Sequence, residues 1–148
     1  MTNTPTTAAW HASTTTVAGR VLTVYARTGL PAGLTVTPAA ELLAEYAATH
    51  PAGRVLIIDA AFALPALVTA PTAAVAVAQR HAGMLVASQR TLTNAKRTGI
   101  DWLAYGDASA VAEASMDLVL IEVPATRDAW LRRLYEGYRA LAVGGILV

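Results

Sequence analysis

The chain has 148 residues, of which 55% are hydrophobic and 14% charged, and its formal net charge is +1. This length is enough for one domain with a hydrophobic core and short for two. The charged fraction lies well below the roughly 25% of ordinary soluble domains, which favours a well-covered sheet, and so small a net charge gives no overall attraction to nucleic acid. The sequence contains no cysteine, which excludes disulfides and thiolate metal sites.

No apolar run approaches the roughly 18 residues that a membrane-spanning helix needs. Arg54, Asp59, Gln79 and Arg80 interrupt the candidates. The amino terminus also lacks the basic segment and apolar core of a secretory signal. We therefore expect a cytoplasmic protein without a membrane segment.

The chain begins with a stretch rich in threonine and alanine, residues 1–19, that shows no hydrophobic period. Such a composition predicts a flexible leader, followed by one domain over residues 20–148. Residues 21–25 combine apolar and β-branched side chains, which predicts a strand.

A helix is expected to begin after the Gly- and Pro-containing loop of residues 29–33. Thr37 is a good N-cap, Pro38 suits the first helical position, and Glu41 lies in the positive first turn. The expected buried stripe of this helix consists of Leu42, Leu43 and Tyr46. The apolar run 55–58 then predicts a strand buried on both faces of a parallel sheet.

The second half of the chain continues the alternation. An alanine-rich helix is expected over residues 71–82, a strand over 84–87, and a helix capped by Ser88 and running to Thr98. Short strands follow at 102–105 and 118–121. A helix over 129–141 should bury Leu131, Leu134, Tyr138 and Leu141, and a last strand begins at Ile146.

Strands separated by helices of this length predict an α/β domain with a doubly wound, mostly parallel sheet. Ligands of such sheets bind at the carboxyl ends of the strands. Asp59, Asp107 and Glu122 each follow an expected strand. Acids at these positions accept hydrogen bonds from ribose hydroxyls or an adenine amino group, and more commonly cap the next helix. Both roles stay open for each of the three.

The turn after residues 55–58 is unusual for a nucleotide-binding domain. Such domains place glycine there, because the backbone must turn tightly and approach the ligand closely. This chain has Asp59, Ala61 and Ala63 instead. The layout therefore indicates a nucleotide-type fold, and the turn indicates that the nucleotide is no longer bound.

Two groups of basic residues lie on expected helices. Arg127, Arg132 and Arg133 could contact phosphate, although a solvated face with an Arg132–Glu136 ion pair is the commoner arrangement. Arg90, Lys96 and Arg97 form a second basic helix face that also suits the negative helix end. The three histidines, His11, His50 and His81, lack metal-ligand spacing, so we expect no metal site.

From about Arg20 onward the chain resembles the class I S-adenosylmethionine-dependent methyltransferases. It looks most like the small-domain group that methylates the exocyclic amine of guanine in ribosomal RNA. Three segments carry the resemblance: an entry strand, loop and helix (residues 22–24, 29–33 and 42–43), the strand before the catalytic loop (117–121), and the helix and Gly144-Gly145 turn that follow (134–148).

The departures from this family concentrate at its site. Ile57, Asp59, Ala61 and Ala63 occupy the D-x-G-x-G-x-G motif, and the ribose-holding acid falls on residues 86–88, which end at Ser88. Only Asp107 matches an adenine-contacting acid. The resemblance thus implies cofactor-binding positions at Asp59, Ala61, Ser88 and Asp107, and a vestigial catalytic loop at Glu122, Val123 and Pro124 in place of Asn-Pro-Pro-aromatic.

Some members of the group carry a degenerate amino-terminal half that does not bind cofactor and supports a catalytic half and its RNA. The resemblance therefore implies a non-catalytic methyltransferase-like domain that needs no cofactor and positions ribosomal RNA. The final strands of the family sheet are missing, so a second methyltransferase domain or another copy of the chain should cover the open edge. An active enzyme using S-adenosylmethionine is the second hypothesis, and a dimerisation scaffold without RNA is the third.

Overall fold

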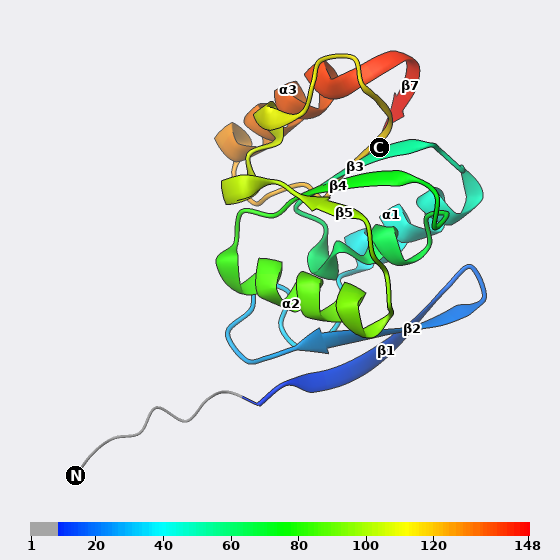
Figure 1. Cartoon of the computed structure of the whole chain (residues 1–148). Coiled ribbons are helices and arrows are strands. Elements are labelled where there is room, and N and C mark those ends of the chain that lie inside the picture. The colour runs from blue at the N-terminus through cyan, green and yellow to red at the C-terminus, as the bar shows by residue number, and fades with distance from the viewer. Residues whose placement is uncertain (1–8) are drawn as a thin grey trace.

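The computed structural model of the chain describes residues 9–148 (Figure 1). Its main sheet has five strands in the order β5-β4-β3-β6-β7, and every neighbouring pair is parallel. The strands are β3 (Arg54–Ile58), β4 (Ala74–Ala78), β5 (Ile100–Trp102), β6 (Met116–Ile121) and β7 (Leu141–Leu147). The prediction of an α/β domain with a doubly wound parallel sheet is confirmed.

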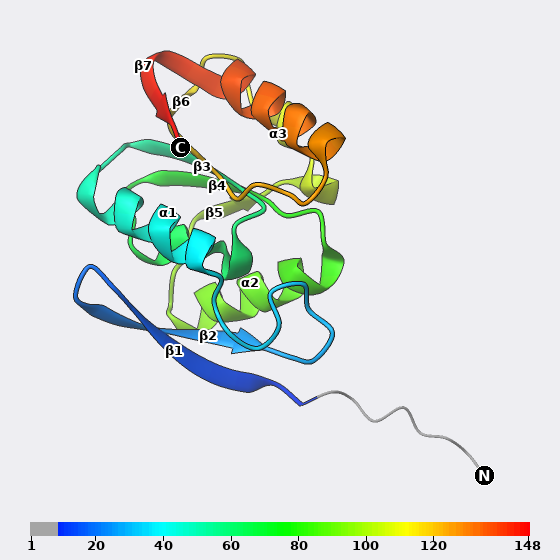
Figure 2. The same ribbon diagram turned by 180° about the vertical axis from the view of Figure 1, so that it is seen from behind.

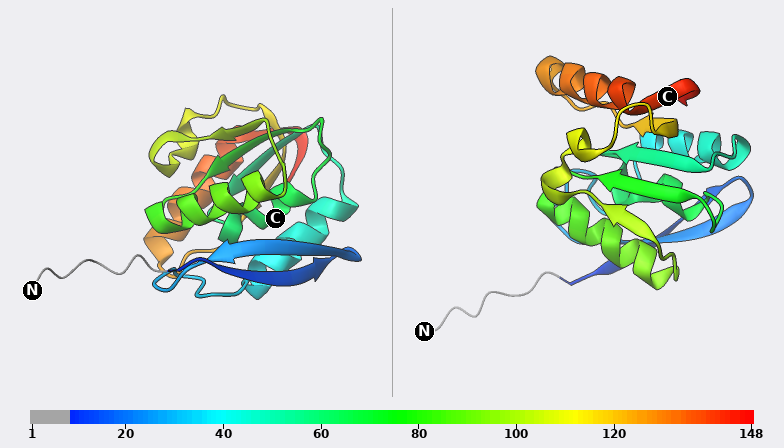
Figure 3. Two further views of the ribbon diagram at one scale, coloured as in Figure 1. Left: turned by 60° about the horizontal axis from the view of Figure 1, so that its bottom comes forward. Right: turned by 45° about the horizontal axis from the view of Figure 1, so that its top comes forward.

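The helices cover both faces of this sheet. Helix α3 (Arg127–Ala140) lies on one face, and α1 (Pro38–Thr49) and α2 (Ala82–Asn94) lie on the other (Figures 1 and 3). Three short 3-10 helices complete the described chain: η1 (Ala61–Leu67), η2 (Ala104–Gly106) and η3 (Ala108–Ala110). A hairpin of β1 (His11–Val17) and β2 (Arg20–Ala26) lies beyond α1 and α2, on their side away from the sheet (Figure 2).

Strand β3 at the centre of the sheet serves both cores. Val55 and Ile57 pack towards α1, α2 and the hairpin, whereas Leu56 and Ile58 pack towards α3, and all four side chains are fully buried. Full burial of one such side chain contributes about 1.5–3 kcal/mol. The prediction that this apolar run forms a strand buried on both faces is confirmed, and β3 is the middle strand of the sheet.

The expectation of a flexible leader over residues 1–19 is wrong for its second half. Residues 1–8 lie outside the described part, but β1 pairs antiparallel with β2 along its whole length, and Val17 is fully buried. β-branched threonines favour this extended pairing, which a composition argument misses. Residues 21–25 form a strand as predicted, although in this separate two-stranded sheet.

Helix α1 begins as predicted, with the Thr37 side chain accepting a hydrogen bond from the Ala40 N–H at 3.1 Å. The predicted buried stripe is only partly correct, because Leu42 is 72% exposed. The buried side chains are Ala40, Leu43, Ala44 and Ala47. Small residues on this face allow α1 to pack closely against η1.

The chain between β3 and β5 differs most from the expectation. The helix expected at residues 71–82 is strand β4, and the strand expected at 84–87 lies inside α2. The side chain of His81, rather than Ser88, caps this helix by accepting from the Met84 N–H. Alternate burial explains β4, since Val75 and Val77 pack on one face of the sheet and its alanines on the other.

Boundaries also differ near the end of the chain. Only Trp102 of the strand expected at 102–105 belongs to a strand, since β5 ends there and η2 begins at Ala104. Strand β7 begins at Leu141, where the sequence predicts the end of a helix. Strand β6 and helix α3 lie where they are predicted.

Helix α3 turns a different face inward from the one predicted. Leu131 and Tyr138 are 49% and 74% exposed, whereas Arg133, Glu136, Gly137 and Ala140 are buried. Arg133 is 1% exposed and pairs with Glu136 at 2.7 Å, so the predicted Arg132–Glu136 pair is replaced by a pair three residues apart. Polar contacts of these buried side chains therefore orient the helix.

The guanidinium of Arg133 bonds three segments of the chain. Its Nε and Nη2 donate to the two carboxylate oxygens of Asp59 at 2.8 and 3.0 Å, and Nη1 donates to the Gly106 carbonyl and to Glu136. Burial alone would lower the pKa of Arg133, but the hydrogen bonds to Asp59 and Glu136 outweigh it and raise that pKa. The guanidinium stays charged, and it joins α3 to the turn after β3 and to the last residue of η2.

The first prediction concerns Gly106. It has φ +62°, and a Cβ there would lie 2.6–2.7 Å from the Gln79 and Arg80 backbone. Gly106→Ala should therefore lower the free energy of unfolding by about 3 kcal/mol, from left-handed strain and overpacking together. Gly99→Ala is the matched control, since φ is +71° and nothing lies within 4 Å. It should cost only about 1 kcal/mol of strain. Equal losses in urea titrations would contradict the close approach.

The second prediction concerns Arg133. Arg133→Met should lower the free energy of unfolding by about 3 kcal/mol or more, because Asp59 and Glu136 lose the charge that compensates their burial. Arg132→Met, one position away on the exposed side of α3, should change it by less than about 0.5 kcal/mol. Thermal melting of the two variants beside the unchanged chain measures the difference. A small effect of Arg133→Met would show that the ion-pair network contributes little.

Candidate functional site

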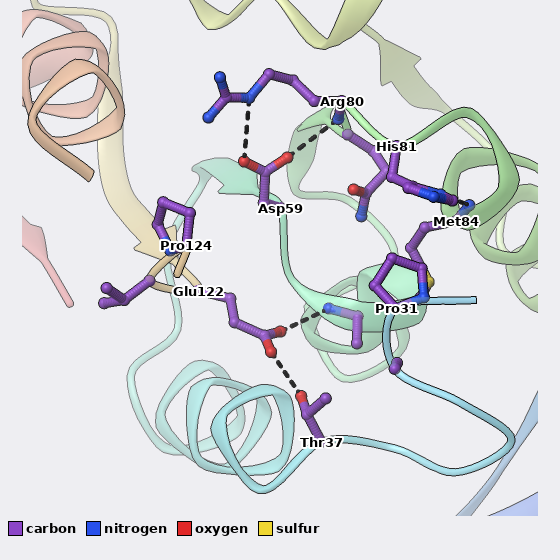
Figure 4. A pocket seen from close by; sticks show the side chains of 12 residues that line it. Pro31, Thr37, Asp59, Arg80, His81, Met84, Glu122 and Pro124 are labelled. Carbon is purple, nitrogen blue, oxygen red and sulfur yellow. Dashed lines mark hydrogen bonds and ion pairs between the residues drawn. The ribbon is translucent and has the colours of Figure 1, made fainter. Parts of the chain in front are cut away.

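A cavity of about 300 Å³ lies at the carboxyl ends of β3, β4 and β6 (Figure 4). The strand order reverses here, because β3 has β4 on one side and β6 on the other, and ligands of doubly wound sheets bind at such a point. Its volume is at the lower end of the roughly 300–1,000 Å³ of small-molecule sites. Twelve residues line it: Pro31, Ala32, Thr37, Asp59, Ala61, Gln79, Arg80, His81, Met84, Glu122, Val123 and Pro124.

Glu122, directly after β6, directs its carboxylate at the turn after β3 (Figure 4). One oxygen accepts from the Ala61 backbone N–H and the other from the Thr37 hydroxyl, each at 2.8 Å. Hydrogen bonds to an ionised acceptor are about twice as strong as those between neutral groups. Glu122 thus joins β6, the α1 N-cap and the turn after β3.

Asp59 is held in a left-handed conformation at the end of β3, with φ 56°. Its carboxylate accepts from the Arg80 backbone N–H at 3.0 Å and from the Arg133 guanidinium. The Arg80 side chain lies farther away, with Nε 3.7 Å from the carboxylate. The acid at the cavity is therefore neutralised from within the chain.

Four backbone N–H groups of the turn after β3 have partners inside the chain. The Asp59 N–H bonds to the Ala78 carbonyl, Ala61 to Glu122, Phe62 to the Met84 sulfur and Ala63 to the Ala60 carbonyl. In nucleotide-binding turns such N–H groups face the ligand. None of these four donors is free for an acceptor on a ligand.

Left-handed backbone occurs at Phe62 and Ala63 too, with φ 57° and 49°. Glycine adopts this conformation without cost, whereas a residue with a Cβ pays roughly 1–2 kcal/mol. Phe62 is fully buried, so its side chain fills the core beneath the turn. The turn keeps a shape that favours glycine while its side chains pack inward.

The end of β4 brings Gln79, Arg80 and His81 to the cavity, a group that the sequence analysis did not assign to a site. The reason is the misplaced strand, since residues 71–82 were expected to be helical. A signal was present in the alternation of alanine and valine over residues 74–78. The segment carries no acid, and the amide of Gln79 donates to the Ala60 carbonyl at 3.4 Å.

Two of the predicted cofactor-binding residues do not line the cavity. Ser88 is fully buried on the inner face of α2, and Asp107 caps η3 by accepting from the Ser109 backbone N–H at 2.9 Å. The Ser109 hydroxyl also bonds to Asp107 and, with that backbone bond, lowers the pKa of Asp107. Asp107 thus has the capping role, whereas Asp59, Ala61, Glu122, Val123 and Pro124 come together.

The described residues, 9–148, contain no cluster of three or more acidic or histidine side chains that could hold a metal ion. No helix in that part of the chain has the length and apolar character needed to cross a membrane. Trp102 and Trp130 are partly buried, and each packs against one of the two cores.

Comparisons with known proteins identify the fold. No family model matches the sequence, and no curated protein does either. Among solved structures, the 16S rRNA methyltransferase RsmC of T. thermophilus, in complex with AdoMet and guanosine, superimposes with a TM-score of 0.76 at 18% identity. The match covers 93% of this chain and 41% of RsmC.

A SAM-dependent methyltransferase from Agrobacterium tumefaciens superimposes with a TM-score of 0.69 at 15% identity, over 97% of this chain and 53% of that one. The chain thus spans about half the length, or less, of these two structures. At such identities the likeness establishes the architecture. The chain has the Rossmann-like fold of the class I S-adenosylmethionine-dependent methyltransferases.

Proposed function

We propose that the chain is a non-catalytic methyltransferase-like domain, which supports or positions RNA for a catalytic domain in the cytoplasm. The observation that carries the proposal is the pair of hydrogen bonds from Ala61 and Thr37 to the Glu122 carboxylate. An acidic group of the chain itself takes up the turn amide that would otherwise meet a ligand.

The residues around the cavity do not fit S-adenosylmethionine. A cofactor acceptor at the turn after β3 would have to displace Glu122 from Ala61, and the other three donors described above are bonded within the chain. Burying Glu122 without these partners would cost about 1–3 kcal/mol. The end of β4 offers Gln79, Arg80 and His81, and none of these is a carboxylate that could accept ribose hydroxyls.

The RNA part of the proposal rests on the comparison with RsmC, whose structure contains guanosine and whose name gives 16S rRNA as its substrate. The chain matches less than half of that protein. A domain of this kind would need a second methyltransferase domain, or another copy of the chain, to supply the chemistry. The open edge at β7, where Val143 is fully exposed, suits such a neighbour.

The alternative is an active S-adenosylmethionine-dependent enzyme that methylates guanine in ribosomal RNA. One observation favours it: the cavity remains at the switch point, with Glu122, Val123 and Pro124 on its wall. Glu122 could accept from a target amine. However, it would bring a negative charge to a site that must admit an anionic strand, and its oxygens already have two donors.

The third prediction separates these two functions. Titration calorimetry of S-adenosylmethionine into the chain should give no binding heat, and the melting midpoint should stay unchanged. A bound ligand at about 100 times its dissociation constant would instead add roughly 2.7 kcal/mol of stability. RsmC is the positive control under the same conditions. Cofactor binding, or methyl transfer from labelled cofactor to ribosomal RNA, would establish the enzyme and reject our proposal.

The fourth prediction tests the role of Glu122 in the fold. Glu122→Ala should lower the free energy of unfolding by about 2 kcal/mol, because the Ala61 N–H and the Thr37 hydroxyl lose a charged acceptor. Glu113→Ala is the control, since Glu113 is largely exposed and lies 3.9 Å from Arg139. It should change stability by less than about 0.5 kcal/mol. A stability of Glu122→Ala equal to the unchanged chain would remove the structural role of this carboxylate.

A further inference from the structure

The basic residues of the chain are unevenly distributed over its surface. The salt bridges among the described residues use Arg54, Arg80, Arg133 and Arg139. Five of the remaining cations belong to β2, α2 and the segments that directly follow them, and none of the five has a carboxylate partner within 4.0 Å in the described chain: Arg20, Arg27, Arg90, Lys96 and Arg97. A net charge of +1 therefore conceals a separate positive region.

A groove of about 670 Å³ runs between β2 and the end of α2. Arg20, Lys96 and Arg97 contribute cations to its lining, and no acidic residue contributes to it. The guanidinium of Arg97 is fixed by carbonyl oxygens of Ala66, Ala70 and Pro71. Its remaining N–H groups bond to the Thr98 carbonyl and the Thr69 hydroxyl. All of these acceptors are neutral, so Arg97 adds positive charge to the groove, although it has no free donor for a phosphate.

Two aromatic side chains extend the positive region along the hairpin. The Trp10 ring is close to two guanidinium groups, with the Arg27 and Arg90 Cζ atoms 5.3 and 4.8 Å from its centroid. Arg90 also lies 5.8 Å from the Tyr25 ring. Trp10 and Tyr25 are both partly exposed. Cationic and aromatic groups therefore alternate beside α2, which runs next to the hairpin (Figure 3).

Two acids of α1 form hydrogen bonds with the hairpin, one with β1 and one with the hairpin turn. Glu41 accepts from Thr15, and Glu45 accepts from the Ala18 backbone N–H. Both carboxylates are thus engaged along the strand that faces α1, whereas the groove follows the strand that faces α2. Because these acids lie on the β1 side of the hairpin, the groove on the β2 side is positively charged.

We propose that this surface, formed by Arg20, Arg27, Arg90, Lys96 and Arg97 with Trp10 and Tyr25, binds single-stranded RNA. The inference rests on the RNA role in the proposed function and assigns it a location. Cations of this surface, Arg20 and Arg90 among them, contact phosphates, and the exposed parts of the two rings stack on bases. A basic groove with aromatic side chains is the arrangement that proteins use for single strands. An acidic peptide would match the charges but would leave the aromatic faces without flat partners.

The test measures fluorescence anisotropy of a labelled single-stranded RNA of about 12 nucleotides, over about 50–300 mM salt. With three phosphate contacts, the slope of log affinity against log salt should be about −2. The double variant Arg20→Glu with Arg90→Glu should bind about tenfold more weakly and lose about 1.4 of this slope, which is 0.7 for each lost contact. Both side chains are exposed, so melting should show an unchanged fold.

The matched control is Arg127→Glu with Arg132→Glu, which makes the same charge change on exposed positions of α3, across the sheet. It should keep at least half of the affinity. Trp10→Leu should weaken binding without changing the salt slope, as expected for lost stacking. Equal weakening by the control pair, or equally strong competition by polyglutamate of matched charge, would reject this surface.

Failure of this inference differs from failure of the proposed function. RNA binding that is unaffected by Arg20→Glu with Arg90→Glu moves the RNA surface elsewhere and leaves the proposed function intact. If the unchanged chain binds no RNA at the lowest salt, this inference and the RNA role are both rejected, and the scaffold hypothesis replaces them. Cofactor binding, measured separately, rejects only the non-catalytic assignment.

Discussion

The buried guanidinium of Arg133 holds together segments beside the cavity at the carboxyl ends of the strands. It reaches from α3 to Asp59 and Gly106. The turn after β3 and the last residue of η2 are therefore both bonded to this helix. A buried ion of this kind is tolerated only when each of its donors has a partner. The side chain of Asp59 is consequently fixed within the protein, and α3 takes its orientation from a polar contact in place of its apolar residues.

Two carboxylates make the cavity different from an ordinary nucleotide site. Asp59 occupies a turn position that glycine would suit, and Glu122, at the end of the neighbouring strand β6, binds the amide of Ala61. Each carboxylate accepts hydrogen bonds from donors of the chain. The architecture of a methyltransferase is retained by burial of β3 and β6, which depends on none of these polar groups. Fold and ligand chemistry are thus set by different residues.

The sequence predicted the structure correctly where the relevant pattern lies within a few neighbouring residues. The apolar runs of β3 and β6 and the cap at Thr37 predicted their elements, and the strands after which Asp59 and Glu122 fall placed both acids at the cavity. It was insufficient for β4, where alternating alanine and valine have weak preferences and tertiary burial decides. Arg133 and Asp59 are 74 residues apart, so their contact leaves no local pattern. Because β4 was misplaced, the position expected to hold a ribose was assigned to Ser88, and Arg80 and His81 were not recognised as residues of the cavity.

The short helix η1 has a consequence for motion. All seven of its residues are buried, although ligand-binding loops usually belong to the least stable parts of a protein, because they open and close. Here the segment after the turn is part of the core between α1 and α2. Opening the cavity at this side would expose Phe62 and Leu64, and would therefore resemble partial unfolding more than the movement of a loop. The wall of the cavity formed by η1 is therefore a rigid part of the core.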